Sequence, residues 1–246
     1  MMVRLTRHGW REMLVGTAVL AAIALGLGYG LSWFASLVCL PVWVWLIAFF
    51  RDPQRVVPPA DQNVMVSPAD GKVSDITQIE HDPLLGGPAV RVGIFLSVFN
   101  VHINRSPCAG QVSAVTYKKG KFINAMKHAE ASDDNESNTI VLIEPKSRRP
   151  VAVVKQIVGL IARRIICTAN VGDTLERGDR IGMIKFGSRT ELTIPIWLKP
   201  ELRVQIGQTV KGASTVITDL GISETTCPAE ADGAAASVPA GRGIPA

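Results

Sequence analysis

The chain has 246 residues, of which 47% are hydrophobic, and this length is sufficient for one well-packed core with an appended segment. The net charge of +5 is modest and the basic residues are not interleaved with aromatic ones, which argues against a nucleic-acid surface and favours an anionic membrane surface as partner. The four cysteines have neither Cys-x-x-Cys pairs nor metal-ligand spacing, so we expect no disulfide framework, no metal and a reducing, cytosol-facing compartment.

The first fifty residues have the composition of a membrane anchor. Residues 1–12 carry three arginines and one acid, and from Met13 to Phe50 there are 38 residues without a charged side chain. One helix needs only about 20 residues to cross the hydrocarbon layer. The sequence therefore predicts a transmembrane hairpin of two helices over 13–50, with its turn in the Gly-rich stretch 26–32.

The flanking charges predict the orientation of this hairpin. Arg11 precedes the uncharged run and Arg51 follows it, so the positive-inside rule places both ends in the cytoplasm. The predicted location is the cytoplasmic membrane, with residues 1–12 as a basic cytoplasmic segment and the later domain on the cytoplasmic face. The alternatives are one span with a re-entrant segment, or a cleaved signal peptide, whose core is shorter than this run.

Prolines end the helical region, and short apolar runs follow it. Pro53, Pro58 and Pro59 prevent a continuous helix in a predicted connector over 51–63. Between 64 and 223 the runs are rich in Val and Ile and are separated by Gly, Pro, Asn and Asp, which predicts a mostly β domain of sandwich or barrel type. The predicted strands cover 64–66, 72–79, 89–104, 111–117, 140–143, 151–157, 163–168, 180–185, 192–197 and 214–218.

Three segments depart from this strand pattern. Residues 118–137 are polar and predict a mobile loop with a helical turn. Residues 171–182 resemble the hairpin of lipoyl and biotin carrier domains, which indicates a barrel-sandwich hybrid, although the lysine context of the carriers is absent. Residues 224–246 are dominated by Ala, Gly, Pro and Ser and are predicted to be disordered.

Gly187-Ser188, the only Gly-Ser dipeptide in the chain, is a candidate self-cleavage site. Glycine has no Cβ, so its carbonyl carbon is open to attack and its backbone can adopt a strained turn. Attack by the Ser188 hydroxyl would convert the amide into an ester, and elimination followed by hydrolysis would leave a pyruvoyl group. The alternative is an ordinary tight turn between two strands.

A serine nucleophile needs a base, and the base needs an orienting group. Of the four histidines, His8, His81 and His128 are expected to be solvated. His102 interrupts a strand-like alternation of apolar and polar residues and is the candidate base, with a half-buried structural histidine as the alternative. Asp70 precedes a glycine in a turn that leads into a strand, where an ordinary turn aspartate is the alternative.

Four motifs together resemble one family. They are Ser-Pro-Ala-Asp-Gly-Lys-Val at 67–73, Asn-Val-His-Ile-Asn-Arg-Ser-Pro at 100–107, Gly-Lys-Phe-Ile-Asn-Ala at 120–125 and Phe-Gly-Ser-Arg at 186–189. Their order and approximate spacing are similar to those of the short-form bacterial phosphatidylserine decarboxylases. The resemblance covers about residues 30–220.

The resemblance implies an enzyme that converts phosphatidylserine to phosphatidylethanolamine and CO2 through a Schiff base to a pyruvoyl group. This group would derive from Ser188, with no metal and no pyridoxal phosphate. The chain would cut itself between Gly187 and Ser188, and the pieces 1–187 and 188–246 would form a heterodimer, with further dimerisation left open. The hairpin would hold the catalytic domain at the membrane surface that supplies the lipid.

The resemblance also assigns roles to individual residues. Asp70, His102 and Ser188 match the family's maturation triad, in which His102 would act as base and Asp70 would fix its tautomer. Longer members carry a second histidine where this chain has Phe99, so another group must donate the proton that decarboxylation requires. Ser137 replaces an arginine that is common in the family, which removes any contact of that arginine with the lipid headgroup.

Two other functions remain open from the sequence. One is a pyruvoyl decarboxylase of a different serine phospholipid, and the other is a membrane-tethered carrier or binding module on the lipoyl-like fold.

Several basic residues could dock on anionic lipid or be simply solvated. They are Arg51, Arg55, Lys118, Lys119 and Lys121.

Overall fold

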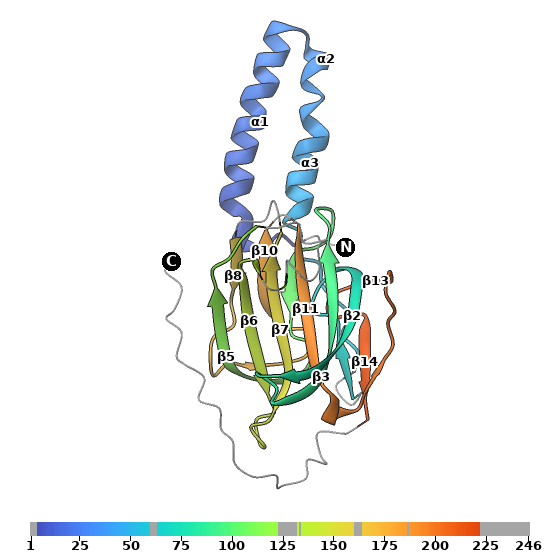
Figure 1. The fold of residues 1–246 in the computed structure, drawn as a ribbon. Coiled ribbons are helices and arrows are strands. Elements are labelled where there is room, and N and C mark those ends of the chain that lie inside the picture. The colour runs from blue at the N-terminus through green and yellow to red at the C-terminus, as the bar shows by residue number, and fades with distance from the viewer. Residues whose placement is uncertain are drawn as a thin grey trace.

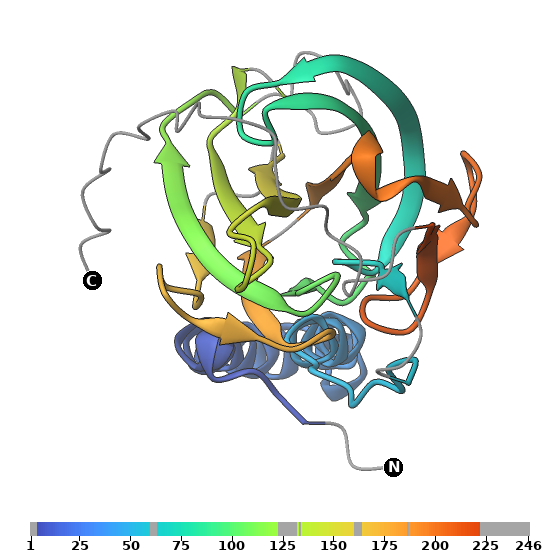
Figure 2. The same cartoon turned by 90° about the horizontal axis from the view of Figure 1, so that it is seen from below.

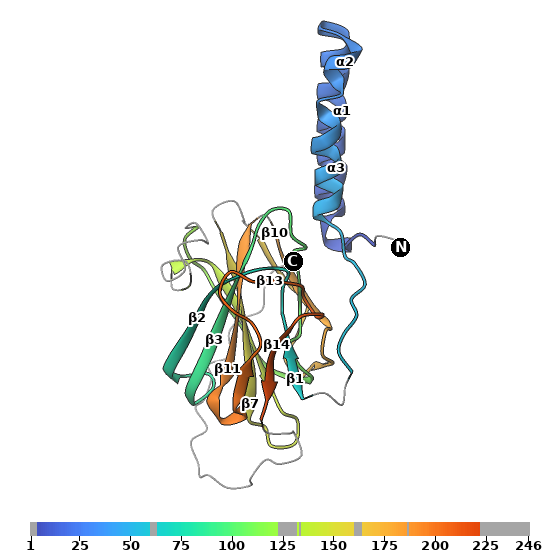
Figure 3. The same ribbon diagram turned by 90° about the vertical axis from the view of Figure 1, so that its right-hand side faces the viewer.

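A helical hairpin projects from one end of a β domain (Figures 1 and 3). The computed structural model describes residues 4–59, 63–122, 132, 134–159, 164–185 and 187–221. A short 3-10 helix η1 (Arg7–Gly9) leads into α1 (Trp10–Gly30), and α2 (Trp33–Ser36) and α3 (Cys39–Phe49) return toward the domain. The predicted tail 224–246, His128 and half of the polar 118–137 segment lie outside the described residues.

The turn of the hairpin lies in the predicted glycine-rich stretch. Helix α1 ends at Gly30, and the Ser32 hydroxyl caps α2 by accepting a hydrogen bond of 3.3 Å from the Ala35 N–H. The segment Arg7–Gly30 is long and apolar enough to cross a membrane, whereas Trp33–Phe49 is apolar but shorter. The first predicted span is therefore supported by length and composition, and the second only by composition.

Antiparallel strands form the domain, which confirms the mostly β prediction. The largest sheet curls into a half-barrel (Figure 2) with the strand order β13-β2-β3-β11-β7-β6-β5-β9. Its strands are β2 (Gly71–Asp82), β3 (Gly87–Leu96), β5 (Gly110–Lys118), β6 (Ser137–Ile143), β7 (Pro150–Val158), β9 (Thr174–Leu175), β11 (Ser188–Pro195) and β13 (Thr209–Val210). Two smaller sheets have the orders β1-β14-β12 and β4-β10-β8. They comprise β1 (Val64–Val66), β12 (Pro200–Leu202), β14 (Val216–Leu220), β4 (Ile103–Arg105), β8 (Arg164–Cys167) and β10 (Arg180–Lys185), and η2 (Ile196–Leu198) follows β11.

The predicted single strand over 89–104 is wrong, because the chain forms a loop inside it. Strand β3 ends at Leu96, and the Asn100 side chain then accepts hydrogen bonds of 2.9 Å from the Ser97 N–H and 2.8 Å from the Ser97 hydroxyl. Such local side-chain bonds compete with strand pairing. Pairing resumes only at Ile103, so His102 lies at the end of a loop that is closed by Asn100.

A separate apolar cluster joins the foot of the hairpin to the domain. Phe49 and Phe50 at the end of α3 pack with Val101, Ile103 and Met183 from the loop and strands below. Gly9 permits this approach, since a Cβ there would overlap the Phe50 ring. The hairpin is therefore packed against the β domain at its base.

A buried carboxylate reinforces this junction. Asp52, three residues after α3 ends at Phe49, accepts a bond of 3.0 Å from Arg105 on β4 and one of 2.6 Å from Arg180 on β10. Its own N–H donates to the Arg4 carbonyl at 2.7 Å. One side chain thus ties the connector to the two strands that flank the candidate site.

We predict that Asp52→Asn lowers the free energy of unfolding by about 3 kcal/mol, because the buried Arg105 guanidinium loses its counter-charge. Denaturant unfolding of the detergent-solubilised protein measures the change. Asp219→Asn is the matched control: its partner Arg203 has a 60% exposed side chain, so its loss should cost less than about 1 kcal/mol. Equal effects of the two substitutions would contradict the role given to Asp52.

Candidate active site

Ser188 begins β11, near the centre of the largest sheet. It pairs with Leu96 on β3 and with Val158 on β7, so both edges of the strand are covered from its first residue. Ser188 is fully buried, and its Oγ has no hydrogen-bond partner within the described part of the chain. A buried hydroxyl without a partner is uncommon and costly, which makes it a candidate for chemistry.

Gly187 occupies the turn between β10 and β11 in a left-handed conformation with φ of 65°. An L-residue adopts this region at a cost of about 1–2 kcal/mol, whereas glycine does so readily. A Cβ would meet only Val98 Cγ1, at 3.7 Å, so space does not require glycine here. The requirement is conformational.

The fully buried imidazole of His102 lies against this turn. Nδ1 lies 3.0 Å from the Asn100 carbonyl, and Nε2 lies 3.3 Å from the Gly187 N–H. The carbonyl can only accept and the N–H can only donate, so these contacts place the ring proton on Nδ1 and the lone pair on Nε2. The structure therefore brings an imidazole lone pair to the Gly187 N–H, one peptide bond before the candidate Gly187-Ser188 cleavage site.

Phe49, the last residue of α3, covers one face of this imidazole. The two ring centroids are 4.4 Å apart with an interplanar angle of 35°. Burial, opposed by the hydrogen bond to the Asn100 carbonyl and assisted by the charge of Arg51, lowers the pKa of His102 to about 4. His102 is therefore neutral at pH 7 and able to accept a proton. Sequence reasoning missed Phe49, because it lies in the uncharged run that was assigned wholly to the anchor.

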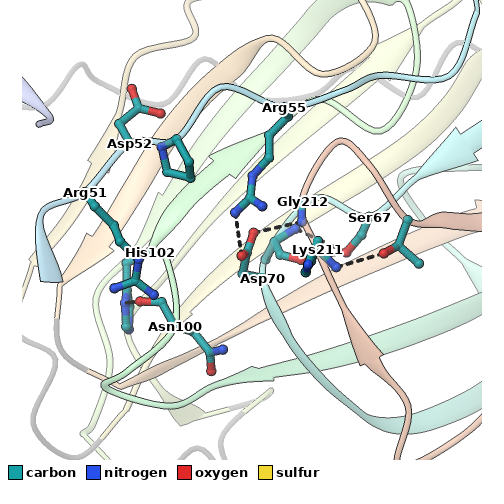
Figure 4. A network of polar contacts seen from close by, with 12 residues as sticks. Arg51, Asp52, Arg55, Ser67, Asp70, Asn100, His102, Lys211 and Gly212 are labelled. Carbon is teal, nitrogen blue, oxygen red and sulfur yellow. Dashed lines mark hydrogen bonds and ion pairs between the residues drawn. The ribbon is translucent and has the colours of Figure 1, made fainter. Parts of the chain in front are cut away.

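Asp70 is buried, but its carboxylate has other partners than His102. It accepts bonds of 2.5 Å from Arg55 on the connector and 2.8 Å from the Gly212 N–H. Figure 4 shows these two contacts of Asp70 beside the separate contact of His102 with Asn100. Within the described residues no hydrogen bond joins Asp70 to His102, since the Asn100 carbonyl occupies Nδ1.

The other residues singled out from the sequence lie elsewhere. His81 is exposed on β2, and His8 lines a cavity at the foot of the hairpin. Phe99 is 71% exposed, and its carbonyl accepts a bond of 2.6 Å from Arg51. Lys121 pairs with Asp134 at 2.9 Å on an exposed surface.

Sequence reasoning also missed the role of Arg189, which follows Ser188 and is fully buried. Its guanidinium contacts Asp75 on β2 at 2.7 Å and Glu191 on β11 at 2.9 Å, and donates to the Ser74 hydroxyl at 2.6 Å. Burial disfavours its charge, but the two carboxylates outweigh this effect and raise the pKa of Arg189. This network fixes the position of the first residues of β11, which include Ser188.

These features together describe a serine–histidine site of the kind that supports nucleophilic attack within a β domain. The candidate nucleophile follows a left-handed glycine whose N–H contacts the candidate base, at the end of the domain that carries the hairpin (Figure 1). Within the described residues no cluster of side chains could hold a metal ion.

Comparison with known proteins identifies the family. The family model for phosphatidylserine decarboxylase matches residues 44–218. A phosphatidylserine decarboxylase proenzyme of Ruegeria pomeroyi is 47% identical over 180 residues, which cover 72% of this chain and 80% of the relative. Proenzymes of the same name from Rhodopirellula baltica and Paraburkholderia phymatum are 44% and 39% identical and cover 85% and 88% of this chain, and 85% and 97% of their own lengths. The chain belongs to the phosphatidylserine decarboxylase family.

We predict that Phe49→Ala raises the pKa of His102 from about 4 toward the ordinary 6.5, because water then reaches the imidazole. At pH 5 the histidine would be mostly neutral in the parent and mostly protonated in the variant. An NMR titration of histidine-labelled protein measures the shift, with His102→Gln to assign the signal. Phe34→Ala removes the same ring from the exposed tip of the hairpin and should leave the titration unchanged.

Proposed function

We propose that this protein is a phosphatidylserine decarboxylase that forms its own pyruvoyl group from Ser188 and releases phosphatidylethanolamine and CO2. Family membership supports the reaction, and the relatives' designation as proenzymes supports processing. The observation that carries the self-processing step is the buried, unpartnered Ser188 hydroxyl directly after a left-handed glycine.

The proposed maturation balances without any outside reagent except water. Ser188 Oγ attacks the Gly187 carbonyl carbon, and the amide nitrogen leaves as an amine, so that an ester joins the two residues. Loss of the Ser188 α-proton then breaks the Cβ–O bond, which releases the Gly187 carboxylate and leaves dehydroalanine. Addition of water and loss of ammonia produce a pyruvoyl group on the nitrogen of Arg189.

The chain's own side chains supply what these steps need. His102 Nε2 is unprotonated, and exchange of its contact from the Gly187 N–H to Ser188 Oγ would let it take the hydroxyl proton. The Asn100 carbonyl holds the imidazole tautomer in the uncut chain. Asp70 is proposed to support the charged imidazole after its carboxylate exchanges Arg55 for His102, and the triad contact forms only then.

The surroundings of Ser188 fit a pyruvoyl group. The strand that would carry it is fixed by Arg189, and the site is buried under the hairpin, which excludes water from a carbonyl that must react with an amine. Once formed, the group supplies an electron sink for the pair that is released when CO2 leaves. No metal and no pyridoxal phosphate is required.

The hairpin provides access to the substrate. A diacyl lipid has a negligible concentration in water, so a catalytic domain held at the bilayer meets its substrate by proximity. We place the protein in the cytoplasmic membrane with the β domain on the cytoplasmic face, because arginines flank both ends of the apolar region. The two pieces 1–187 and 188–246 would remain together as a heterodimer.

Ser188→Ala should remain a single full-length chain without decarboxylase activity on phosphatidylserine vesicles, because the attacking oxygen is absent. Denaturing electrophoresis and intact mass spectrometry measure the cut and the loss of ammonia. Ser113→Ala, which removes a hydroxyl from β5, should process normally. A Ser188→Ala chain that still splits after Gly187 would refute the proposed nucleophile.

Gly187→Ala should slow processing about tenfold, since a left-handed alanine costs about 1–2 kcal/mol and the competent turn becomes correspondingly rarer. The half-time of appearance of the smaller piece after synthesis measures the rate. Gly86→Ala is the matched control, because Gly86 also has a positive φ, of 71°, with open space around it, but lies in the β2–β3 turn. Equal slowing in both variants would mean a general folding defect.

A further inference from the structure

Two adjoining cavities lie at the foot of the hairpin. Their volumes are about 520 Å³ and 260 Å³, and Arg7 and His8 line both. The amino-terminal segment and α1 form one side, and β8, β10 and the connector form the other. Neither cavity is lined by Gly187, Ser188 or His102, so this combined basic cavity is separate from the candidate active site.

The basic cavity has an excess of positive charge. Its cationic side chains are Arg4, Arg7, Arg11, Arg164, Arg180 and Lys185, and its carboxylates are those of Asp52 and Glu12. Both carboxylates already form ion pairs: Asp52 with Arg105 and Arg180, and Glu12 with Lys185. In the part of the chain that the structure describes, Arg4, Arg7 and Arg164 are exposed and form no salt bridge. Their mutual repulsion would be relieved by a bound anion.

The position of the cavity indicates where that anion comes from. Helix α1 starts at Trp10, whose exposed ring lies 5.6 Å from the Arg11 guanidinium. Leu14 and Val15, three and four residues after Arg11, share its helix face and are exposed. Away from the domain, this face passes from arginine and tryptophan to aliphatic side chains. A phospholipid leaflet has the matching order, from the charged headgroups through the interface to the acyl chains.

We propose that the basic cavity binds the phosphate headgroup of an anionic phospholipid that is not undergoing reaction. A phosphate placed between Arg7 and Arg164 can accept charge-assisted hydrogen bonds from both guanidinium groups. The acyl chains of the same lipid would lie along the exposed apolar face of α1. A bilayer lipid fits better than a soluble phosphate ester, because the aliphatic side chains beside the cavity offer a soluble ester nothing to contact.

Native mass spectrometry of the full-length protein tests this site. The protein is released from micelles that contain equal amounts of phosphatidylglycerol and phosphatidylcholine, and the ratio of the two lipid adducts is measured. The parent should retain phosphatidylglycerol preferentially. Arg4→Gln with Arg7→Gln should reduce this preference by about fivefold for each arginine removed. Arg164→Gln, which changes one exposed side chain on β8, should reduce the preference by about fivefold. It tests the site even if the double variant fails to fold.

Controls separate a defined site from general charge. Lys146→Gln with Arg148→Gln removes two exposed charges from the β6–β7 turn, at the end of the domain away from the hairpin (Figure 1), and should keep the parent's preference. Excess glycerol 3-phosphate should not displace the lipid adduct. Absence of a preference in the parent, an unchanged preference in the Arg164→Gln variant, or displacement by glycerol 3-phosphate would each overturn the proposal. All readouts are independent of cleavage at Ser188.

Discussion

The buried imidazole of His102 is the point at which the hairpin and the β domain meet. One face of the ring lies against Phe49 of α3, Nδ1 lies against the Asn100 carbonyl, and Nε2 faces the Gly187 N–H. Removal of water keeps the ring neutral, and the two polar contacts decide which nitrogen carries the proton. The protonation state of this candidate base therefore depends on a residue that, by sequence, belongs to the predicted membrane anchor.

Ion pairs between the hairpin region and the strands join the foot of the hairpin to the domain. Asp52 is bound by Arg105 and Arg180, and Glu12 of α1 pairs with the buried Lys185 at the end of β10, two residues before Gly187. Buried ion pairs add little net stability but strongly disfavour arrangements that leave one partner alone. The hairpin is thus held in one position relative to the turn that contains the candidate scissile bond.

Much of this architecture could be predicted from residue patterns, and the exceptions have physical causes. The strands at Val64–Val66 and Arg180–Lys185 match their predicted bounds, since both are short apolar runs between turn residues. The prediction of a single strand over 89–104 is wrong because Asn100 closes a loop inside this run. No sequence pattern marks Arg189 as buried, and only the fold reveals the carboxylates of Asp75 and Glu191 around it. No linear pattern distinguishes an aromatic ring that faces lipid from one, like that of Phe49, that covers an imidazole.

The central position of β11 in its sheet determines whether the cleaved protein could refold after global unfolding. A cut before Ser188 would leave β11 hydrogen-bonded to β3 and β7, β13 to β2, and β14 to β1, so two of the three sheets would combine strands from both sides of the cut. The pieces cannot separate without loss of the whole core. After denaturation, however, recovery would become a bimolecular encounter between fragments that had folded originally as one chain. The working life of such a molecule would then end at its first global unfolding, and only new synthesis could replace it.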